Sequence, residues 1–352
     1  MGHLQRRLTE RIRLWNHTSL KEATRESRWL TLTAASLVFA VKILDSQLLK
    51  MRVSFIGLGN MGAPLARRIA AQYPNTAVFD LSERATSAFV AAAPGSRQAT
   101  SFADAVAEAD VVLTCVPRSE NTMSIARELI DSNALKEGAV WVDTTSGEPS
   151  ASRSIYDLLA SAGVQFLDAA VSGGPAGAES GTVTCMIGGD SAAFELAKPV
   201  VEQFSGNIVH IGASGAGHAV KAVNNCIMGA QIMLAGEACA TLVRHGVDPA
   251  KALAAINTSS GRSWATMQRL PDHVLPRTFD YNFALELLRK DVGICKAMIN
   301  DDGTSHPERA ELLSAFFPLL DAAAAALDDD ADHTEIVKIA ERANGVEIKP
   351  FN

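Results

Sequence analysis

From residue 51 to residue 212 the chain alternates short apolar runs with segments whose apolar residues recur at helical spacing. Short apolar runs predict buried strands, and their alternation with helices predicts an α/β domain with a doubly wound sheet. The predicted strands are residues 53–56, 76–80, 109–117, 139–145, 164–169, 182–189 and 207–212. Ligands of such sheets bind at the carboxyl ends of the strands, so the residues that follow these runs are the first candidates for a site.

The second half of the chain shows helical periodicity without a convincing strand. Residues 215–245 are mostly apolar and end at Gly246, which predicts one long helix between two domains. Further helices are predicted at 249–256, 283–300, 307–327 and 334–344, the last begun by a capping box of Asp332 and Glu335. The pattern therefore predicts a Rossmann-type domain at 51–212 and an all-helical domain at 213–352.

Residues 1–50 do not share this pattern. They carry nine Lys and Arg against four Asp and Glu, and their apolar run at 29–41 is too short to span a bilayer. The acidic residues also disfavour a signal or transit peptide. We expect the core protein to begin at Met51, with residues 1–50 as a dispensable extension or, as the second possibility, an amphipathic docking segment.

Composition narrows the class of protein. The 352 residues carry a formal net charge of −7, which gives no reason to expect a nucleic acid or a membrane as a partner. The five cysteines lie far apart without a CxxC pair, and the histidines form no zinc-binding pattern, so neither a disulfide framework nor a metal site is expected. A reducing, cytoplasmic compartment fits this cysteine usage best.

The stretch FIGLGNMGAPLARRI contains a glycine fingerprint directly after the first predicted strand and before a helix. In this G-x-G-x-x-G spacing, Gly57 permits a tight turn, Gly59 lets the backbone approach a pyrophosphate, and Gly62 lets helix and strand pack closely. The helix start, with Asn60 and Met61 in the turn, offers backbone N–H groups to phosphates. The spacing therefore predicts dinucleotide binding.

An acidic residue and two strand ends extend this cofactor site. Asp80 ends the second predicted strand, where a carboxylate binds the adenosine ribose and repels a 2′-phosphate, so NAD is favoured over NADP. Arg84 nearby keeps NADP possible. By their place at strand ends, the pairs Val116-Pro117 and Thr145-Ser146 should line the same ligand.

Lys221 is the one charged residue in an apolar part of the long helix, and Asn225 follows it on the same helix face. Oxidation of an alcohol needs a group that takes the hydroxyl proton or stabilises the alkoxide, and a desolvated lysine can do either. Alternatively, Lys221 extends its ammonium group to solvent or pairs with an acid such as Glu237. His218 is expected to line or cap the start of the helix rather than act as a base.

Ser172, Gly173 and Gly174 form part of a second glycine-rich stretch. A hydroxyl with consecutive backbone N–H groups can bind a carboxylate, although a plain turn between strands would read the same way. The polar stretch at 259–268 is expected to lie at a helix junction and to influence substrate choice. The acidic run at 328–330 is interpreted as a solvated turn.

Four motifs in order, FIGLGNMGAPLARRI, DAAVSGGPAGAESGTVTCMIGG, GAGHAVKAVNN and LLRKDVGICKAM, resemble the β-hydroxyacid dehydrogenase family over nearly all of residues 51–345. Ala170 stands where the family usually has proline. The resemblance implies Lys221 as the catalytic lysine with Asn225 as its substrate-holding partner, and Ser172 to Gly174 as the carboxylate site. It also implies Ser146, or Thr145 by a shift of one, near the nicotinamide, and Lys290 beside Asp291 as a lysine that closes over the cofactor.

We therefore expect an NAD-dependent oxidoreductase that interconverts a small β-hydroxy acid, 3-hydroxyisobutyrate-like, and its semialdehyde. By the family's habit it should be a homodimer or homotetramer with the long helix in its core. An imine reductase of the same superfamily would normally lack Lys221, and a non-enzymatic dinucleotide-binding module should have lost Lys221 or the glycines. The individual hydroxy acid stays open.

Overall fold

The computed structural model describes residues 51–300 and 307–351, so the expectation for residues 1–50 lies outside the described residues. The chain divides into two compact units. In the described part, the first unit holds residues 51–145 and 149–217, and the second holds residues 146–148 and 218–351. The division falls inside the long helix α10, Ala216–Arg244, between Gly217 and His218.

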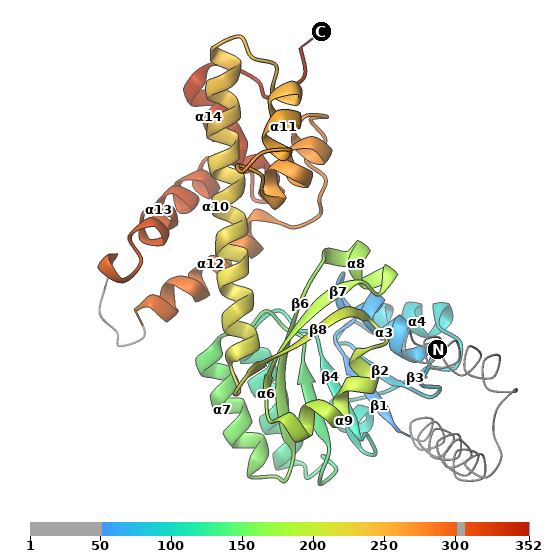
Figure 1. Ribbon diagram of the computed structural model, residues 1–352. Helices are drawn as coiled ribbons and strands as arrows, with labels where there is room; N and C mark the ends of the chain where they lie inside the picture. The colour runs from blue at the N-terminus through green and yellow to red at the C-terminus, as the bar shows by residue number, and fades with distance from the viewer. Residues whose placement is uncertain (1–50, 301–306, 352) are drawn as a thin grey trace, which may run out of the picture. The chain divides into compact units, whose positions relative to one another are not determined.

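The first unit contains an eight-stranded sheet in the order β3-β2-β1-β4-β5-β6-β7-β8 (Figure 1). All neighbours run parallel except β6 and β7, which are antiparallel. The strands are β1 Val53–Ile56, β2 Ala77–Phe79, β3 Arg97–Gln98, β4 Val111–Thr114, β5 Val140–Asp143, β6 Gln165–Ser172, β7 Val183–Gly189 and β8 Ser205–Gly212. The two exposed residues of β3 were not predicted, because so short a polar strand leaves no hydrophobic pattern.

Successive residues of the central strands pack into two different cores. Phe55 belongs to one hydrophobic cluster and its neighbour Ile56 to another, and Leu113 and Val112 divide in the same way. Side chains alternate across a strand, so both faces of the sheet are covered. The covering helices are α3 Gly62–Ala70, α4 Glu83–Ala92, α5 Phe102–Val106, α6 Ser119–Asp131, α7 Pro149–Ala160, α8 Gly174–Ser180 and α9 Ser191–Val201. The predicted doubly wound α/β fold is confirmed.

The second unit is helical in its described residues, as predicted. After α10 it contains α11 Pro249–Asn257, the π-helix η1 Ala265–Val274, α12 Leu285–Ile299, the 3₁₀ turn η2 Pro307–Arg309, α13 Glu311–Ala325, the 3₁₀ turn η3 His333–Ile336 and α14 Val337–Asn344. Two expectations need correction. Residues 265–274, within and after the expected polar junction, are helical, and the predicted helix at 307–327 is interrupted at Ala310. The expected capping box of Asp332 and Glu335 is present, but it begins η3, which leads into α14.

Helix α10 is long and apolar enough, by length and composition, to cross a membrane, and among the described helices it alone meets that test. A core helix of a soluble protein meets it equally well. Cys226 and Ile232 of α10 are fully buried in the core of the second unit, together with Leu288 of α12. The apolar composition of α10 is therefore explained in part by packing within this unit.

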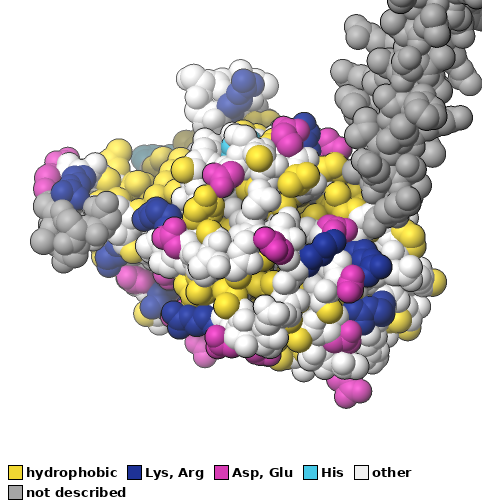
Figure 2. Space-filling model, turned by 90° about the horizontal axis from the view of Figure 1, so that it is seen from below, with side chains coloured by type: hydrophobic (Ala, Val, Ile, Leu, Met, Phe, Trp, Pro, Cys, Tyr) yellow, Lys and Arg dark blue, Asp and Glu magenta, His cyan; other side chains and the backbone are white. Residues whose placement is uncertain are grey.

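Figure 2 shows one face of the molecule, on which Lys and Arg side chains are interspersed with Asp and Glu. Opposite charges that alternate at short distances cancel one another's field within a Debye length. No extended basic patch covers this face of the described residues.

Candidate functional site

The glycine-rich turn begins where β1 ends and leads into α3. A Cβ on Gly57, whose φ is +97°, would lie 2.2 Å from the Cys115 carbonyl oxygen, and one on Gly62 would lie 2.0 Å from the Gly57 oxygen. A Cβ on Gly59 would meet nothing within 4 Å. Gly57 and Gly62 are thus required by the packing of the turn itself. Gly59 leaves open space, as a turn that receives a pyrophosphate requires.

Asp80 connects the end of β2 to this turn. Its Oδ2 accepts a hydrogen bond from the Leu58 backbone N–H at 2.7 Å, and its Oδ1 accepts one from the Ser82 N–H at 2.8 Å. The side chain is half-buried. Asp80 therefore fixes the shape of the turn in addition to presenting a carboxylate beside it. Arg84 is exposed on α4, and Asn60 is exposed in the turn, next to Met61 at the N-cap of α3.

The ends of β4 and β5 meet this turn. The Val116 N–H donates to the Thr145 hydroxyl at 3.2 Å, and Pro117 follows on the surface. The Cys115 N–H donates to the Ile56 carbonyl oxygen at 2.9 Å, which ties the end of β4 to the end of β1. The predicted cofactor residues of the first unit therefore lie at adjacent strand ends.

Ser172, Gly173 and Gly174 form the junction of β6 and α8. Ser172 ends the strand, Gly173 is the N-cap of the helix with φ of +143°, and Gly174 has φ of +66°. Both values favour glycine, so this backbone accounts for Gly173 and Gly174 but not for Ser172. The turn explains the glycines without a ligand, and the predicted carboxylate site here stays a prediction.

In the second unit, Lys221 lies close to a group of polar side chains from α10 and α12. The Asn225 side-chain amide donates to Asp291 Oδ2 at 2.6 Å, and both residues are buried. The Lys290 ammonium nitrogen lies 3.2 Å from Asp291 Oδ1 and donates to the Ser146 carbonyl oxygen at 2.9 Å. We call Lys221, Asn225, Lys290, Asp291 and the Ser146 carbonyl the Lys221 cluster.

The charges of the Lys221 cluster act on Lys221 in opposite directions. Burial lowers the pKa of the Lys221 ammonium, the Asp291 carboxylate opposes this shift, and the Lys290 ammonium adds to it. The net direction is downward, toward the range in which a lysine can exchange a proton at neutral pH. The direction of this shift is the one that a proton-transfer role of Lys221 requires, and that role stays a prediction.

Sequence reasoning places Asp291 only beside Lys290 and misses it as a site residue. The structure places it at the centre of the cluster, in contact with both Asn225 and Lys290. A signal was available, because Asp291 lies on the apolar stripe of α12 formed by Leu288, Val292 and Cys295. A charged residue on a buried stripe, like Lys221 on α10, indicates a partner or a function.

Other candidate residues are placed by the structure without a defined role. Ser146 enters the cluster through its backbone carbonyl, whereas the hydroxyl of its neighbour Thr145 accepts a hydrogen bond from the Val116 N–H. Which of the two hydroxyls lies near the nicotinamide therefore stays open. His218 is buried near the start of α10. The helix η1 packs on α11 and η3, and the prediction that residues 259–268 influence substrate choice stays untested.

Two family models match the chain. Residues 52–212 match the NAD-binding domain of 6-phosphogluconate dehydrogenase, and residues 215–340 match the NAD-binding domain of NADP-dependent 3-hydroxyisobutyrate dehydrogenase. Together they cover nearly all of the described residues.

Two curated relatives match over most of their length. An NAD-dependent L-serine dehydrogenase of Pseudomonas aeruginosa is 35% identical over 76% of this chain and 92% of the relative. A 2-(hydroxymethyl)glutarate dehydrogenase of Eubacterium barkeri is 31% identical over 85% of this chain and 97% of the relative.

Among solved structures, the 3-hydroxyisobutyrate dehydrogenase of Mycobacterium tuberculosis with L-serine is 29% identical, with a TM-score of 0.75 over 82% of this chain and 98% of that chain. An imine reductase from a Pseudomonas species shares the fold alone, at 18% identity and a TM-score of 0.54 over 82% of this chain and 98% of that chain. The chain belongs to the β-hydroxyacid dehydrogenase family and is an NAD(P)-dependent dehydrogenase that acts on a CH–OH group.

Proposed function

We propose that this enzyme interconverts a small β-hydroxy acid and its semialdehyde, with NAD preferred over NADP. The substrates named for the relatives are 3-hydroxyisobutyrate, L-serine and 2-(hydroxymethyl)glutarate. All three contain a CH₂OH group on the carbon that carries a carboxylate, and differ only in the third substituent of that carbon. We expect the substrate to contain this unit, with the third substituent undetermined.

The Lys221 cluster carries the proposal. Lys221, with its lowered pKa, takes the hydroxyl proton or stabilises the alkoxide as the C–H bond weakens, and Asn225 orients the hydroxyl. Nicotinamide supplies the hydride acceptor when it is bound. The Asp291 carboxylate holds Asn225 in one orientation, because it accepts only from the NH₂ end of the amide.

The remaining site residues are assigned by position. We propose that Gly57 to Gly62 hold the pyrophosphate and Asp80 the adenosine ribose, with Val116, Pro117, Ser146 and Lys290 toward the nicotinamide. Ser172, Gly173 and Gly174 would bind the substrate carboxylate. The proposed NAD-binding domain is residues 51–212, and the helical domain is residues 213–352.

A panel of 3-hydroxypropanoates tests the function directly. The third substituent should be varied through methyl, amino, hydroxyl and carboxyethyl, with NAD and NADP each supplied and reduction followed by absorbance. We expect turnover of at least one member with NAD at higher kcat/KM than with NADP. Turnover of cyclic imines with no hydroxy acid oxidised would favour the imine reductase alternative, and binding of NAD without any turnover would favour a binding module. Lys221 argues against both.

We further propose that the protein forms a homodimer or homotetramer through α10. Val220, Ile227 and Leu234 recur every seven residues on this helix and are 38%, 47% and 68% exposed. A seven-residue apolar repeat is the pattern by which two helices pack together. Leu234→Glu should lower the mass measured by light scattering, whereas Glu237→Gln on the same helix should not.

We also propose that the enzyme is cytoplasmic. Its five cysteines are free thiols, which is typical of proteins from a reducing compartment.

A further inference from the structure

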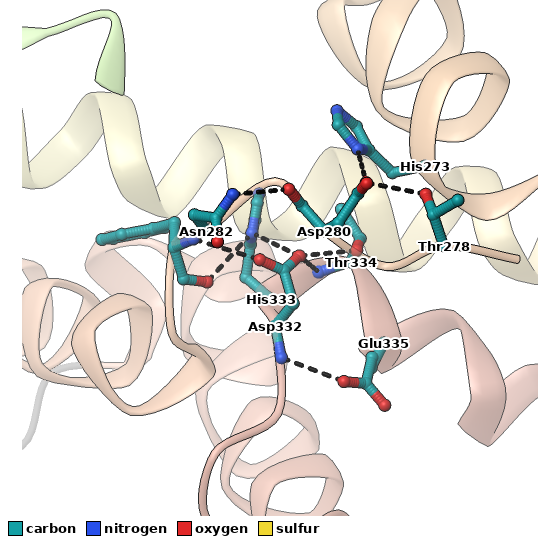
Figure 3. A network of polar contacts seen from close by, with 9 residues as sticks. His273, Thr278, Asp280, Asn282, Asp332, His333, Thr334 and Glu335 are labelled. Carbon is teal, nitrogen blue, oxygen red and sulfur yellow. Dashed lines mark hydrogen bonds and ion pairs between the residues drawn. The ribbon is translucent and has the colours of Figure 1, made fainter. Parts of the chain in front are cut away.

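We propose that Asp332 and His333 are positioning residues for the reaction, because they fix the start of α12 and thereby the placement of Lys290 and Asp291. This inference rests on the proposed role of the Lys221 cluster. It concerns a polar network in the second unit, shown in Figure 3, that lies outside that cluster.

The residues just before and at the start of α12 pair with the residues that begin η3. The His333 N–H donates to the Phe283 carbonyl oxygen at 2.9 Å, and the Leu285 N–H donates to the Ala331 carbonyl oxygen at 2.8 Å. Ala284 and Asp332 form an antiparallel bridge between these two bonds. We call this pairing of residues 283–285 with 331–333 the short ladder.

The Asp332 side chain reinforces the short ladder. Its Oδ2 accepts from the Phe283 N–H at 3.1 Å, and its Oδ1 accepts from the Thr334 N–H at 2.9 Å and hydroxyl at 2.6 Å (Figure 3). Its own N–H donates to Glu335 Oε1 at 3.0 Å. Asp332 is buried, so each of these bonds is shielded from water.

The His333 ring holds the same segment from the other side. Nδ1 lies 3.2 Å from both Asp332 Oδ1 and the Phe283 carbonyl oxygen, and the ring is fully buried. It packs against Tyr281 and Phe283, with ring centroids 5.1 and 5.4 Å apart. The Arg269 guanidinium in turn lies over the Tyr281 ring, 3.6 Å from the ring centroid.

The segment that leads into α12 needs such support from outside. Arg277, Phe279 and Asn282 all have positive φ, at 65°, 48° and 65°. Non-glycine residues in this region are held there at a free-energy cost, so surrounding contacts must determine the path of the backbone. The short ladder, with Asp332 and His333, supplies contacts at the point where this segment becomes α12.

The start of α12 sets the position of the Lys221 cluster. Asp291 lies six residues after Leu285, about 9 Å along a helix. Its 2.6 Å bond to Asn225 is lost if the shift or rotation of α12 moves Asp291 away by about 1 Å. Loss of the ladder should therefore reach the reaction through Asp291 and Lys290, by way of the placement of α12.

The test compares Asp332→Ala, Asp332→Asn and His333→Gln with Asp280→Asn. Asp280 lies in the same network, bonded to His273 and Thr278, and is exposed, so it serves as the matched control (Figure 3). We expect Asp332→Ala to lower kcat about 10-fold or more, and to raise KM for NAD by a smaller factor through the displacement of Lys290. Asp332→Asn, which keeps one acceptor, should recover part of the loss, and Asp280→Asn should resemble the wild type.

Amide hydrogen exchange provides a readout that needs no substrate. The amides of residues 285–292 should exchange faster in Asp332→Ala and His333→Gln than in Asp280→Asn, with the amides of β1 and β4 unchanged. Unchanged exchange in α12, or a kcat that falls only in proportion to the unfolded fraction seen by circular dichroism, would overturn the inference. If Asp332→Ala does not fold, Asp332→Asn and His333→Gln decide. A wild-type enzyme that oxidises no hydroxy acid refutes the proposed function, and the exchange data still test the anchoring of α12.

Discussion

The glycine-rich turn of the first unit and the Lys221 cluster of the second differ in the groups from which they are built. The turn presents backbone groups and open space at Gly59, and its residues follow one another in the chain. The cluster is built mainly from charged and amide side chains on α10 and α12, about 70 residues apart, in buried surroundings. Backbone sites depend on conformation and clearance, whereas buried charges depend on the partners that neutralise them.

Among the variants proposed for the two sites, replacement of Lys221 should cause the largest loss of activity. Lys221→Met should lower kcat by about 10²- to 10⁴-fold, because the proton-transfer group is removed. Burial lowers the pKa of Lys221 from its usual 10.5, so the unfolded chain binds this proton more readily than the folded chain. Stability therefore rises as pH rises from the lowered pKa of the folded chain toward 10.5. The uncharged methionine should therefore leave the free energy of unfolding unchanged or higher. Steady-state assays of NAD reduction measure kcat, and urea unfolding at neutral pH measures the free energy of unfolding. Wild-type kcat would refute the assigned role.

Two glycine variants separate packing from cofactor binding within the turn. In Gly62→Ala the new methyl group would lie 2.0 Å from a backbone oxygen, so the free energy of unfolding should fall by about 2–3 kcal/mol and NAD affinity should fall as well. Gly59→Ala meets no protein atom, so it should fold normally and lose NAD affinity alone. Thermal unfolding and NAD titration by fluorescence distinguish them. Equal NAD affinity in Gly59→Ala and the wild type would contradict the placement of the pyrophosphate.

Removal of the Asp291 charge tests whether the cluster tunes Lys221. The Asp291 carboxylate opposes the lowering of the Lys221 pKa, so Asp291→Asn should lower that pKa further. The rise of kcat/KM with pH should then move to lower pH by roughly one unit. Asp321→Asn, which removes an exposed carboxylate paired with Arg289, is the control and should leave the profile in place. An unchanged pH profile of kcat/KM in Asp291→Asn would mean that the profile does not reflect the titration of Lys221.

The smallest expected effect concerns Asp80. Asp80→Asn should raise KM for NAD about 3- to 10-fold, since a charged acceptor becomes a neutral one both for the ribose and for the Leu58 N–H. The ratio of NADP to NAD activity should rise, because repulsion of a 2′-phosphate is reduced. Initial rates with both cofactors measure the ratio. A ratio that stays constant would show that Asp80 acts on the turn alone.

Much of the first unit could be predicted because its signals are local. The strands β1, β4 and β5 are short, fully buried and mostly apolar, and the glycine spacing at 57, 59 and 62 reflects the clearances of one turn. The strand β3 and the helix η1 were missed, because neither leaves a regular hydrophobic pattern and both are formed by contacts with neighbouring elements.

The sequence by itself determined the fold class and the glycine-rich turn, and it marked Lys221 as the candidate catalytic residue, because a glycine spacing and a charge in an apolar helix are both visible along the chain. Only the tertiary structure showed that Asp291 links Asn225 to Lys290, and that Asp332 and His333 are bonded to Phe283 just before α12. Both sets of contacts depend on which buried polar groups form hydrogen bonds or ion pairs with one another. That pairing is decided by how distant helices pack, and hydrophobic patterning fixes the buried faces of helices without specifying the polar contacts between them.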